Sequence, residues 1–201
     1  MSLNVSLADY GVGNLHSLKK SLENCGANVT VITDMRDILK ADCIAFPGVG
    51  AFDKTMERLG PCREEIREYL ETGVPCLGIC IGTQILFDGS DEGAAPGLGF
   101  LKGRVVHLKA KQIPHMGWNS VETEDPLFDG IDNRYFYFAH SYCGSPDDAS
   151  VIKGMTEYEN IRIPTFFRKK NFVGSQFHPE KSSASGMRFL MNFVKFAEDC
   201  Q

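Results

Sequence analysis

The sequence predicts an α/β protein in which helices cover both faces of a mostly parallel central sheet. In the first half, short apolar runs alternate with stretches that carry apolar residues at helical spacing, which gives a β-α-β-α-β order over residues 3–79. This order is typical of parallel strands whose connecting helices pack on the sheet. In the second half, several short strand candidates are separated by turns. They predict antiparallel additions to the same three-layer architecture.

Each element of the first half follows from a local pattern. Strands are expected at 3–7, 28–32, 43–46 and 75–79, where apolar residues are consecutive or alternate with polar ones. Helices are expected at 14–24, at 35–39 with Asp34 as the N-cap, and at 52–72. The last stretch mixes charged residues with Met56, Ile66 and Leu70, and Gly60-Pro61 is expected to interrupt its helix.

The second half is rich in short strand candidates. Strands are expected at 99–108, 120–122, 135–139, 150–155, 164–169 and 171–176. Residues 182–197 carry apolar side chains at helical spacing and predict a closing helix, while residues 88–99 are rich in Gly, Ala, Asp and Pro and predict a surface loop. Because there is no internal repeat or linker-like tract, residues 1–201 are expected to form a single domain.

Length, charge and cysteine content narrow the class of protein. The chain has 201 residues, of which 43% are hydrophobic, and a net charge of −5, which gives no electrostatic support for a nucleic-acid partner. No signal peptide is visible, and no apolar run reaches the ~20 residues of a membrane helix. Seven cysteines without a Cys-x-x-Cys pair and five scattered histidines predict no metal site and a reducing cytoplasm. No cofactor is expected.

The first candidate for catalysis is Cys80. It stands in Gly78-Ile79-Cys80-Ile81-Gly82, directly after a predicted strand and before a predicted helix. This is the G-x-S-x-G pattern of a nucleophile elbow with cysteine in place of serine, and glycines are needed there because side chains would collide in so sharp a turn. The thiol would then lie at the N-terminal end of a helix, where the dipole favours thiolate. A buried structural cysteine between two glycines is the alternative.

A base and an orienting carboxylate stand near the end of the chain. The predicted strand at 171–176 leads into His178-Pro179-Glu180. Residues two apart on an extended backbone point to the same side, so the imidazole and the carboxylate are expected to face each other. A carboxylate beside an imidazole fixes its tautomer and stabilises its charged form. A strand end with a surface His and Glu is the alternative, but together with Cys80 these residues predict a nucleophile, a base and an orienting group.

With these motifs the chain resembles the class I (triad-type) glutamine amidotransferases. It is most similar to the glutaminase subunits of imidazole glycerol phosphate synthases. The resemblance covers nearly the whole chain. Besides the elbow, five stretches carry it: Asp9-Tyr10-Gly11-Val12-Gly13-Asn14, 46–52, His115-Met116-Gly117-Trp118-Asn119, 135–142 and Gln176-Phe177-His178-Pro179-Glu180-Lys181-Ser182. In one departure, Ile81-Gly82-Thr83-Gln84 stands where the family more often has Leu-Gly-Met-Gln. Thr83 is expected to change the packing beneath the glutamine pocket.

The resemblance implies roles for individual residues. Cys80, His178 and Glu180 would hydrolyse the side-chain amide of glutamine through a thioester. The backbone amides of Ile81 and of Val49 or Gly50 would bind the oxyanion. The substrate would be held by Gln84, Glu92, Ser141 and Tyr142. The partner interface and the ammonia exit would include Asn14, His115, Met116, Trp118 and Lys181, with Trp118 in a loop.

The resemblance also implies a partner. The chain has no room for a second, ammonia-using domain, so a separate (β/α)₈-barrel cyclase is expected to receive the ammonia in a heterodimer. It would make imidazole glycerol phosphate and an aminoimidazole carboxamide ribotide. The alternative within enzymes is a paralogous subunit that supplies ammonia to another pathway, such as sugar amidination. A different class is a redox sensor or chaperone with a reactive elbow cysteine, which would not need the His178-Pro179-Glu180 segment.

Overall fold

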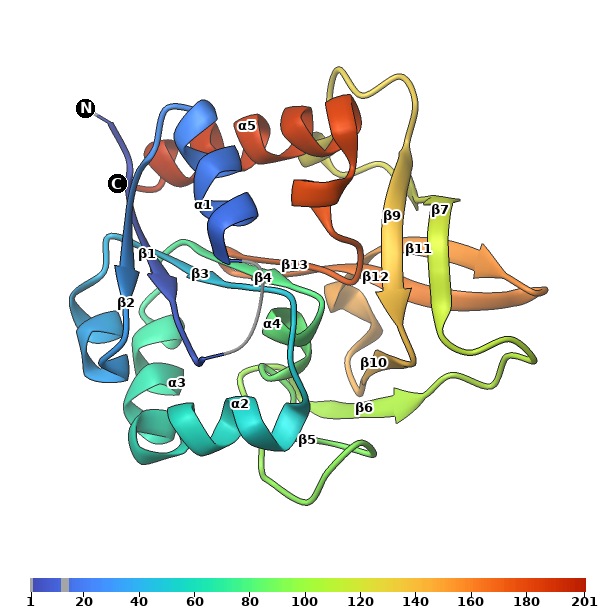
Figure 1. Ribbon diagram of the computed structural model, residues 1–201, viewed down its shortest axis with the longest axis horizontal. Coiled ribbons are helices and arrows are strands. Elements are labelled where there is room, and N and C mark those ends of the chain that lie inside the picture. Colours follow the sequence, from blue (N-terminus) through green and yellow to red (C-terminus); the bar gives the residue numbers. More distant parts are fainter. Residues whose placement is uncertain (1, 12–14) are drawn as a thin grey trace.

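The computed structural model describes residues 2–11 and 15–201, and its main feature is an eight-stranded sheet (Figure 1). From edge to edge the sheet contains β2 (Asn28–Ile32), β1 (Asn4–Ala8), β3 (Cys43–Phe46), β4 (Cys76–Ile79), β13 (Phe172–Ser175), β12 (Ile161–Lys169), β11 (Ile152–Tyr158) and β8 (Glu122–Thr123). The first five are parallel, and the last three are antiparallel. This confirms the predicted mostly parallel sheet with antiparallel additions from the second half.

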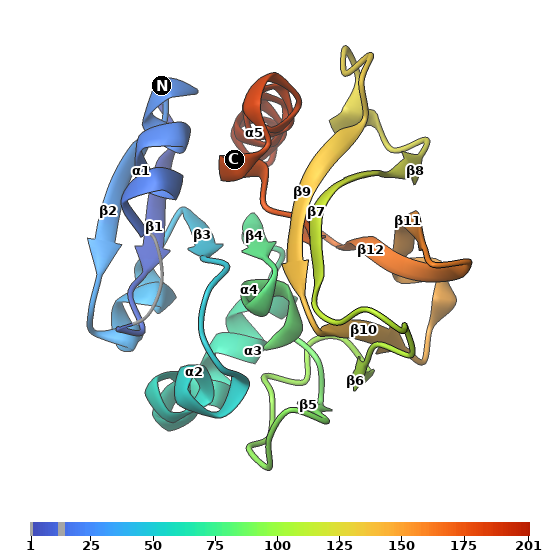
Figure 2. The same cartoon turned by 45° about the vertical axis from the view of Figure 1, so that its right-hand side comes forward.

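Helices cover both faces of the sheet, as Figures 1 and 2 show. One face carries α1 (Leu15–Asn24) and α5 (Ser183–Asp199). The opposite face carries η1 (Met35–Lys40), α2 (Phe52–Leu59), η2 (Gly60–Cys62), α3 (Arg63–Glu71) and α4 (Ile81–Gln84). Three further 3₁₀ turns are η3 (Pro126–Phe128), η4 (Ala149–Val151) and η5 (Pro179–Lys181). The helices and the sheet therefore form three layers.

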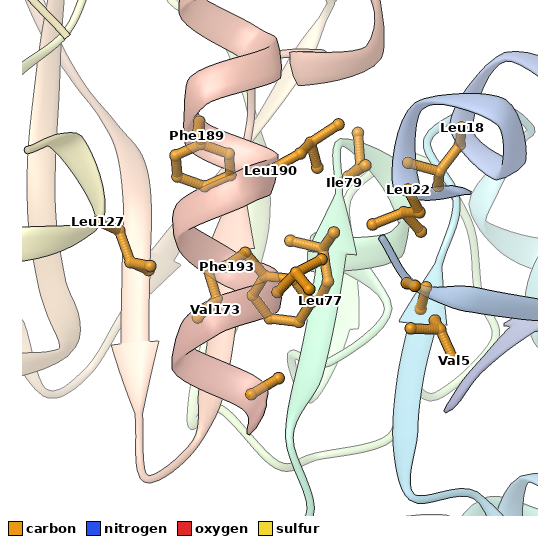
Figure 3. Packing of buried hydrophobic residues seen from close by; sticks show 14 of the residues in the cluster. Val5, Leu18, Leu22, Leu77, Ile79, Leu127, Val173, Phe189, Leu190 and Phe193 are labelled. Carbon is orange, nitrogen blue, oxygen red and sulfur yellow. The ribbon is translucent and has the colours of Figure 1, made fainter. Parts of the chain in front are cut away.

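The two faces of the sheet bury separate apolar clusters. Because successive side chains of a strand point to opposite faces, Leu77 and Ile79 of β4 reach the α1 and α5 side, where they belong to one cluster with Phe193 of α5 (Figure 3). Phe46 of β3 and Phe172 of β13 belong to the cluster on the α2 and α3 side. All residues of β3, β4 and β13 are buried, as expected for parallel strands covered on both faces. This rigid centre carries the candidate site.

Two smaller sheets extend the second half of the chain. The antiparallel pair β7 (His115–Ser120) and β9 (Tyr135–His140) forms a ribbon, and β10 (Tyr142–Pro146), β6 (Gly103–His107) and β5 (Gly89–Ser90) form a three-stranded sheet. The backbone N–H of His178 donates to the carbonyl of Tyr137, 2.8 Å away, and so joins the ribbon to the end of β13. The ribbon is therefore tied directly to the segment that contains the predicted base.

Several predicted elements differ from the structure. The strand expected from residue 99 begins only at Gly103, because Gly99 and Gly103 adopt φ angles of 71° and 117° around a turn. The expected 88–99 loop contains β5, and β10 was not predicted, since its Gly144 and Pro146 are poor strand formers. The prediction that Trp118 lies in a loop is wrong, because it stands in β7. Asp34 does cap η1, and helix 52–72 does break at residues 60–62.

Candidate active site

The candidate site lies where three neighbouring parallel strands end. β3 leads into Pro47–Gly50, β4 leads into Cys80, and β13 leads through Gln176 to His178 and Glu180. The register pairs Phe46 with Gly78 and Ile79 with Ser175, so the three strands end at nearly the same level. The carboxyl ends of parallel strands are where open α/β sheets place their ligands. Segments far apart in the sequence thus meet at one edge of the sheet.

Cys80 adopts the strained backbone of a nucleophile elbow. Its φ and ψ angles are 48° and −110°, a combination that costs a non-glycine residue about 1–3 kcal/mol. A Cβ atom at Gly78 would lie 2.7 Å from the carbonyl oxygen of Gly82, and one at Gly82 would lie 2.1 Å from that of Phe46. Both glycines are therefore required by contact with backbone. The following helix, α4, has only four residues, so its dipole adds little to the charge at the thiol.

Thr83 strengthens the same turn from behind. Its hydroxyl group lies 2.8 Å from the carbonyl oxygen of Gly78 and 3.0 Å from that of Ser175, and its side chain is buried. The Ser175 carbonyl also accepts the backbone N–H of Cys80 at 2.7 Å. Thr83 thus joins the ends of β4 and β13 at the point where the two strands diverge.

His178 and Glu180 face each other, as the sequence predicts. Nδ1 of His178 lies 2.9 Å from Oε1 of Glu180, and the two side chains are 1% and 5% exposed. Burial alone would lower the pKa of His178, but hydrogen bonds and charge interactions with Cys80 and Glu180 outweigh it and raise that pKa to about 9. The imidazole is therefore protonated at neutral pH. A cation between a thiol and a carboxylate is the arrangement that supports a thiolate nucleophile.

A small cavity opens beside Cys80. Its volume is about 220 Å³, below the ~300–1,000 Å³ of typical drug-sized ligand sites. It brings together most of the residues that the sequence predicts for substrate and oxyanion binding. Pro114, Ala139 and His140 also line it, although the sequence does not predict them there. The predicted residues that line it are Gly50, Cys80, Ile81, Gln84, Glu92, Met116, Ser141 and Tyr142. Val49 does not line the cavity, although its neighbour Gly50 does, with a φ angle of 136°.

Some polar groups around the cavity form hydrogen bonds with backbone groups of the protein. Nε2 of Gln84 donates to the carbonyl of Tyr142 at 2.9 Å, and a carboxylate oxygen of Glu92 accepts the backbone N–H of Phe52 at 3.1 Å. The Ser141 carbonyl accepts the N–H of Leu108. Gln84 and Glu92 therefore fix the walls of the cavity as well as lining it. Glu92 does so by satisfying a free N–H at the start of α2.

A buried pair of histidines lies beside the cavity, and one of them, His140, lines it. Nδ1 of His140 lies 2.9 Å from the Tyr142 carbonyl, and its Nε2 lies 3.1 Å from Nδ1 of His115. Nδ2 of Asn119 lies 3.3 Å from the remaining ring nitrogen of His115. Since the carbonyl can only accept and the Asn119 amide nitrogen can only donate, both rings are neutral with a single consistent tautomer. Burial lowers the pKa of His115 to about 4 and that of His140 to about 3.

The residues of β7 that were predicted at a partner interface point to opposite sides of the strand. Met116 and Trp118 point outward and are 63% and 51% exposed, whereas His115 points inward and is 2% exposed. Lys181 is exposed, and its Nζ lies 5.9 Å from the ring centre of Tyr137, which packs edge-on against Trp118. Trp118, Tyr137 and Lys181 therefore form one surface group. Asn14 lies outside the described residues.

Sequence reasoning missed two polar residues of the site. Gln176, 0% exposed, lies with Nε2 3.5 Å from the Cys80 sulfur. His140 lines the cavity and supports Tyr142. Both stand inside stretches that carry the family resemblance, but no spacing rule links them to Cys80. Among residues 2–11 and 15–201, no group of three or more His, Cys, Asp or Glu side chains could hold a metal, and no helix could cross a membrane.

Comparisons with known proteins identify the family of the chain. The family model for class-I glutamine amidotransferases matches residues 6–196. The imidazole glycerol phosphate synthase subunit HisH of Natronomonas pharaonis is 42% identical over 203 residues, which cover 96% of this chain and 94% of the relative. The imidazole glycerol phosphate synthase subunit HisH 1 of Methanococcus maripaludis is 44% identical over 201 residues, which cover 95% of this chain and 98% of the relative.

Solved structures share the fold at lower identity. A glutamine amidotransferase crystal structure matches with a TM-score of 0.75 at 18% identity and covers 96% of this chain and 98% of that chain. The structure of PurLQS from Thermotoga maritima matches with a TM-score of 0.73 at 19% identity and covers 99% of both chains. The fold is shared with these structures, and the family follows from the matching model and the more similar sequences. The chain therefore belongs to the class I glutamine amidotransferases and, within them, to the family of the imidazole glycerol phosphate synthase subunit HisH.

Proposed function

We propose that this chain is the glutaminase subunit of an imidazole glycerol phosphate synthase. The observation that carries the proposal is the position of His178, whose Nδ1 lies 2.9 Å from Glu180 and whose pKa is raised by Glu180 and Cys80, beside a cavity of about 220 Å³. Such a pair can deliver a thiolate and a proton to the same amide bond. The cavity is of a size for a free amino acid, and the chain is more than 40% identical to subunits named for this synthase.

The reaction would run in two halves. The Cys80 thiolate attacks the side-chain carboxamide carbon of glutamine, and His178 gives its proton to the leaving nitrogen, so that ammonia departs and a thioester remains. Water then attacks the thioester, gives a proton to His178, and releases glutamate as the electron pair of the C–S bond returns to sulfur. Glu180 keeps the imidazole oriented throughout.

Backbone amides would hold the oxyanion in both halves. Ile81 is the first residue of α4, where the backbone N–H has no partner within the helix. The second donor comes from Val49 or Gly50, whose segment is anchored by the Tyr10 hydroxyl on the Pro47 carbonyl at 2.7 Å. Donors of this kind are worth about 3–4 kcal/mol of barrier. Gln84, Glu92, Ser141 and Tyr142 would position the substrate, as the cavity lining supports.

The ammonia would pass to a (β/α)₈-barrel cyclase bound in a heterodimer. The exposed Met116 and Trp118 support a docking face on β7, because large apolar side chains on one strand surface are typical of interfaces. Met116 also lines the cavity, so the proposed docking face adjoins the site of ammonia release. Residues 1–201 are proposed to act as one domain in the cytoplasm, where the seven free cysteines would stay reduced.

Glutamate release from glutamine tests the proposal. We expect slow release by the chain alone and strong activation when the cyclase and its nucleotide ligand are added. Cys80→Ala is expected to abolish release, whereas Cys62→Ala, another buried cysteine remote from the cavity, should leave it near the parent. Release that persists in Cys80→Ala would overturn the nucleophile. Activation by an ammonia-accepting synthase of another pathway, without activation by the cyclase, would favour the paralogous subunit instead.

A further inference from the structure

We infer that Gln176 is a catalytic hydrogen-bond donor to the Cys80 sulfur, an inference that rests on the proposed function. Nε2 of Gln176 lies 3.5 Å from Sγ, within hydrogen-bonding distance for sulfur, and the Gln176 side chain is fully buried. The sulfur therefore has two polar neighbours, the imidazole of His178 and this amide. Gln176 approaches it from within the protein, because it does not line the cavity.

The direction of the Gln176 amide follows from its partners. The Tyr142 carbonyl can only accept a hydrogen bond, so the group of Gln84 that lies 2.9 Å away must be its NH₂. The same NH₂ lies 3.1 Å from the other end of Gln176, which must therefore be the carbonyl oxygen. A flipped Gln176 would bring two NH₂ groups together. The Gln176 NH₂ is thus left to face Cys80.

The groups at both ends of this series of hydrogen bonds are held in place by other contacts. The Tyr142 carbonyl also accepts the Nδ1–H of neutral His140, and the backbone N–H of Gln176 donates to the Thr165 carbonyl at 2.8 Å. Each member has one consistent role as donor or acceptor, so the amide is fixed before substrate arrives. A donor fixed in advance costs no reorganisation during the reaction, which is the condition for electrostatic stabilisation of a developing charge.

The donor matters where the sulfur carries negative charge. Hydrogen bonds to an ionised acceptor are roughly twice as strong as neutral ones, so the amide favours the thiolate over the thiol. The thioester sulfur is neutral and a poor acceptor. In the second half-reaction the C–S bond breaks and its electron pair returns to sulfur, where the Gln176 N–H stabilises it. Gln176 is therefore expected to help both the attack and the departure of sulfur.

The test is the rate at which iodoacetamide alkylates Cys80 from pH 5 to pH 10, measured by mass spectrometry of the peptide in the full chain. Gln176→Met removes the donor at similar volume, and Gln176→Glu keeps the shape but presents an oxygen. We expect alkylation at pH 7 to fall about tenfold in Gln176→Met and further in Gln176→Glu, with the half-maximal rate moved to higher pH. Cys200, which is partly exposed, serves as the reference in the same sample.

A variant of Gln84 and a test of folding complete the experiment. Gln84→Met leaves the donor but removes its anchor, so it should give a smaller shift of the same alkylation profile. Thermal melting identifies any variant that fails to fold. One folded variant, either Gln176→Met or Gln176→Glu, is sufficient for the test. Alkylation profiles of folded Gln176→Met or Gln176→Glu that coincide with the parent would overturn the donor role. Alkylation needs no glutamine and no partner, so its result is independent of whether glutaminase activity is found.

Discussion

Nδ1 of His115 lies 3.1 Å from Nε2 of His140, and both rings are buried in their neutral form. His115 is also stacked between Phe138 and Tyr158, with ring centres 4.6 and 4.0 Å away. A proton on either ring would place two hydrogen-bond donors against each other in a site with little water. The pair therefore links β7 to β9 beside the cavity only while neither ring is charged.

Acid should destabilise the protein through this pair. Unfolding restores both pKa values to about 6.5, whereas burial holds them at about 4 and about 3 in the folded state. Their contribution to stability is therefore present above pH 6.5 and is lost as the pH falls toward 4, because the unfolded chain binds protons that the folded chain does not. Each histidine should lower the free energy of unfolding by about 1.4 kcal/mol per pH unit in that window.

Urea unfolding at several pH values measures this loss. In His115→Phe, which keeps the aromatic stacking, the slope of stability against pH between 4 and 6.5 should be clearly shallower than in the parent. His16→Gln, at an exposed helix position, is the matched control and should keep the parental slope. An unchanged slope in His115→Phe would show that the pair does not govern acid stability.

Gly82 should tolerate no side chain. An alanine Cβ would meet the Phe46 carbonyl oxygen at 2.1 Å, and both backbones belong to the packed centre. We expect Gly82→Ala to lower the free energy of unfolding by about 3 kcal/mol or more. Gly60→Ala is the control, since its φ is −53° and nothing lies within 4 Å of the added atom. Comparable stability of Gly82→Ala and Gly60→Ala in urea would refute the steric account.

Thr83 should contribute through its hydroxyl group. Thr83→Val keeps the shape but withdraws the donor from the carbonyls of Gly78 and Ser175. Stability is expected to fall by about 1–2 kcal/mol, and the maximal rate of glutamine hydrolysis should fall more than the KM rises, because the substrate is not touched. Thr83→Ser should restore most of both losses. Equal behaviour of the Val and Ser variants would exclude the hydroxyl as the cause.

Glu180 should maintain the charge on His178. Glu180→Gln keeps the shape of the side chain while it removes one of the groups that raise the pKa of His178 to about 9. The titration of His178, followed by NMR, should move toward neutral pH, and glutamate release should fall by about a hundredfold or more. Glu68→Gln, at an exposed helix position, should change neither quantity. A His178 titration that stays near pH 9 would mean that Cys80 alone sustains the charge.

Trp118 should report on the docking of a partner. It is half exposed on β7 and packs edge-on against Tyr137, with 6.3 Å between ring centres. Trp118→Ala is expected to weaken binding of the cyclase subunit by about tenfold, with little change in the stability of the isolated chain. Met191→Ala, an exposed apolar residue on α5, is the control. Calorimetric titration with the cyclase measures the affinity of each variant. Equal affinities for Trp118→Ala and Met191→Ala would place the interface elsewhere.

The sequence predicted the parts of this molecule that depend on local pattern. The elbow around Cys80 follows from two glycines, and the facing of His178 and Glu180 follows from the two-residue period of extended backbone. Gln176 could not be found in this way, because its contact with Cys80 depends on the pairing of β4 with β13, 96 residues apart. The position of Trp118 in a strand was missed for a similar reason, since β7 exists only by pairing with β9.

The alignment of β13 beside β4 has a consequence for evolution of the chain. Sulfur and imidazole come from adjacent strands, so their separation is set by the spacing of the main chains rather than by flexible loops. A slip of β13 by a single residue would turn the whole set of its side chains over and present Phe177 where His178 now stands. An insertion within β13 would therefore take His178 away from its place beside Cys80.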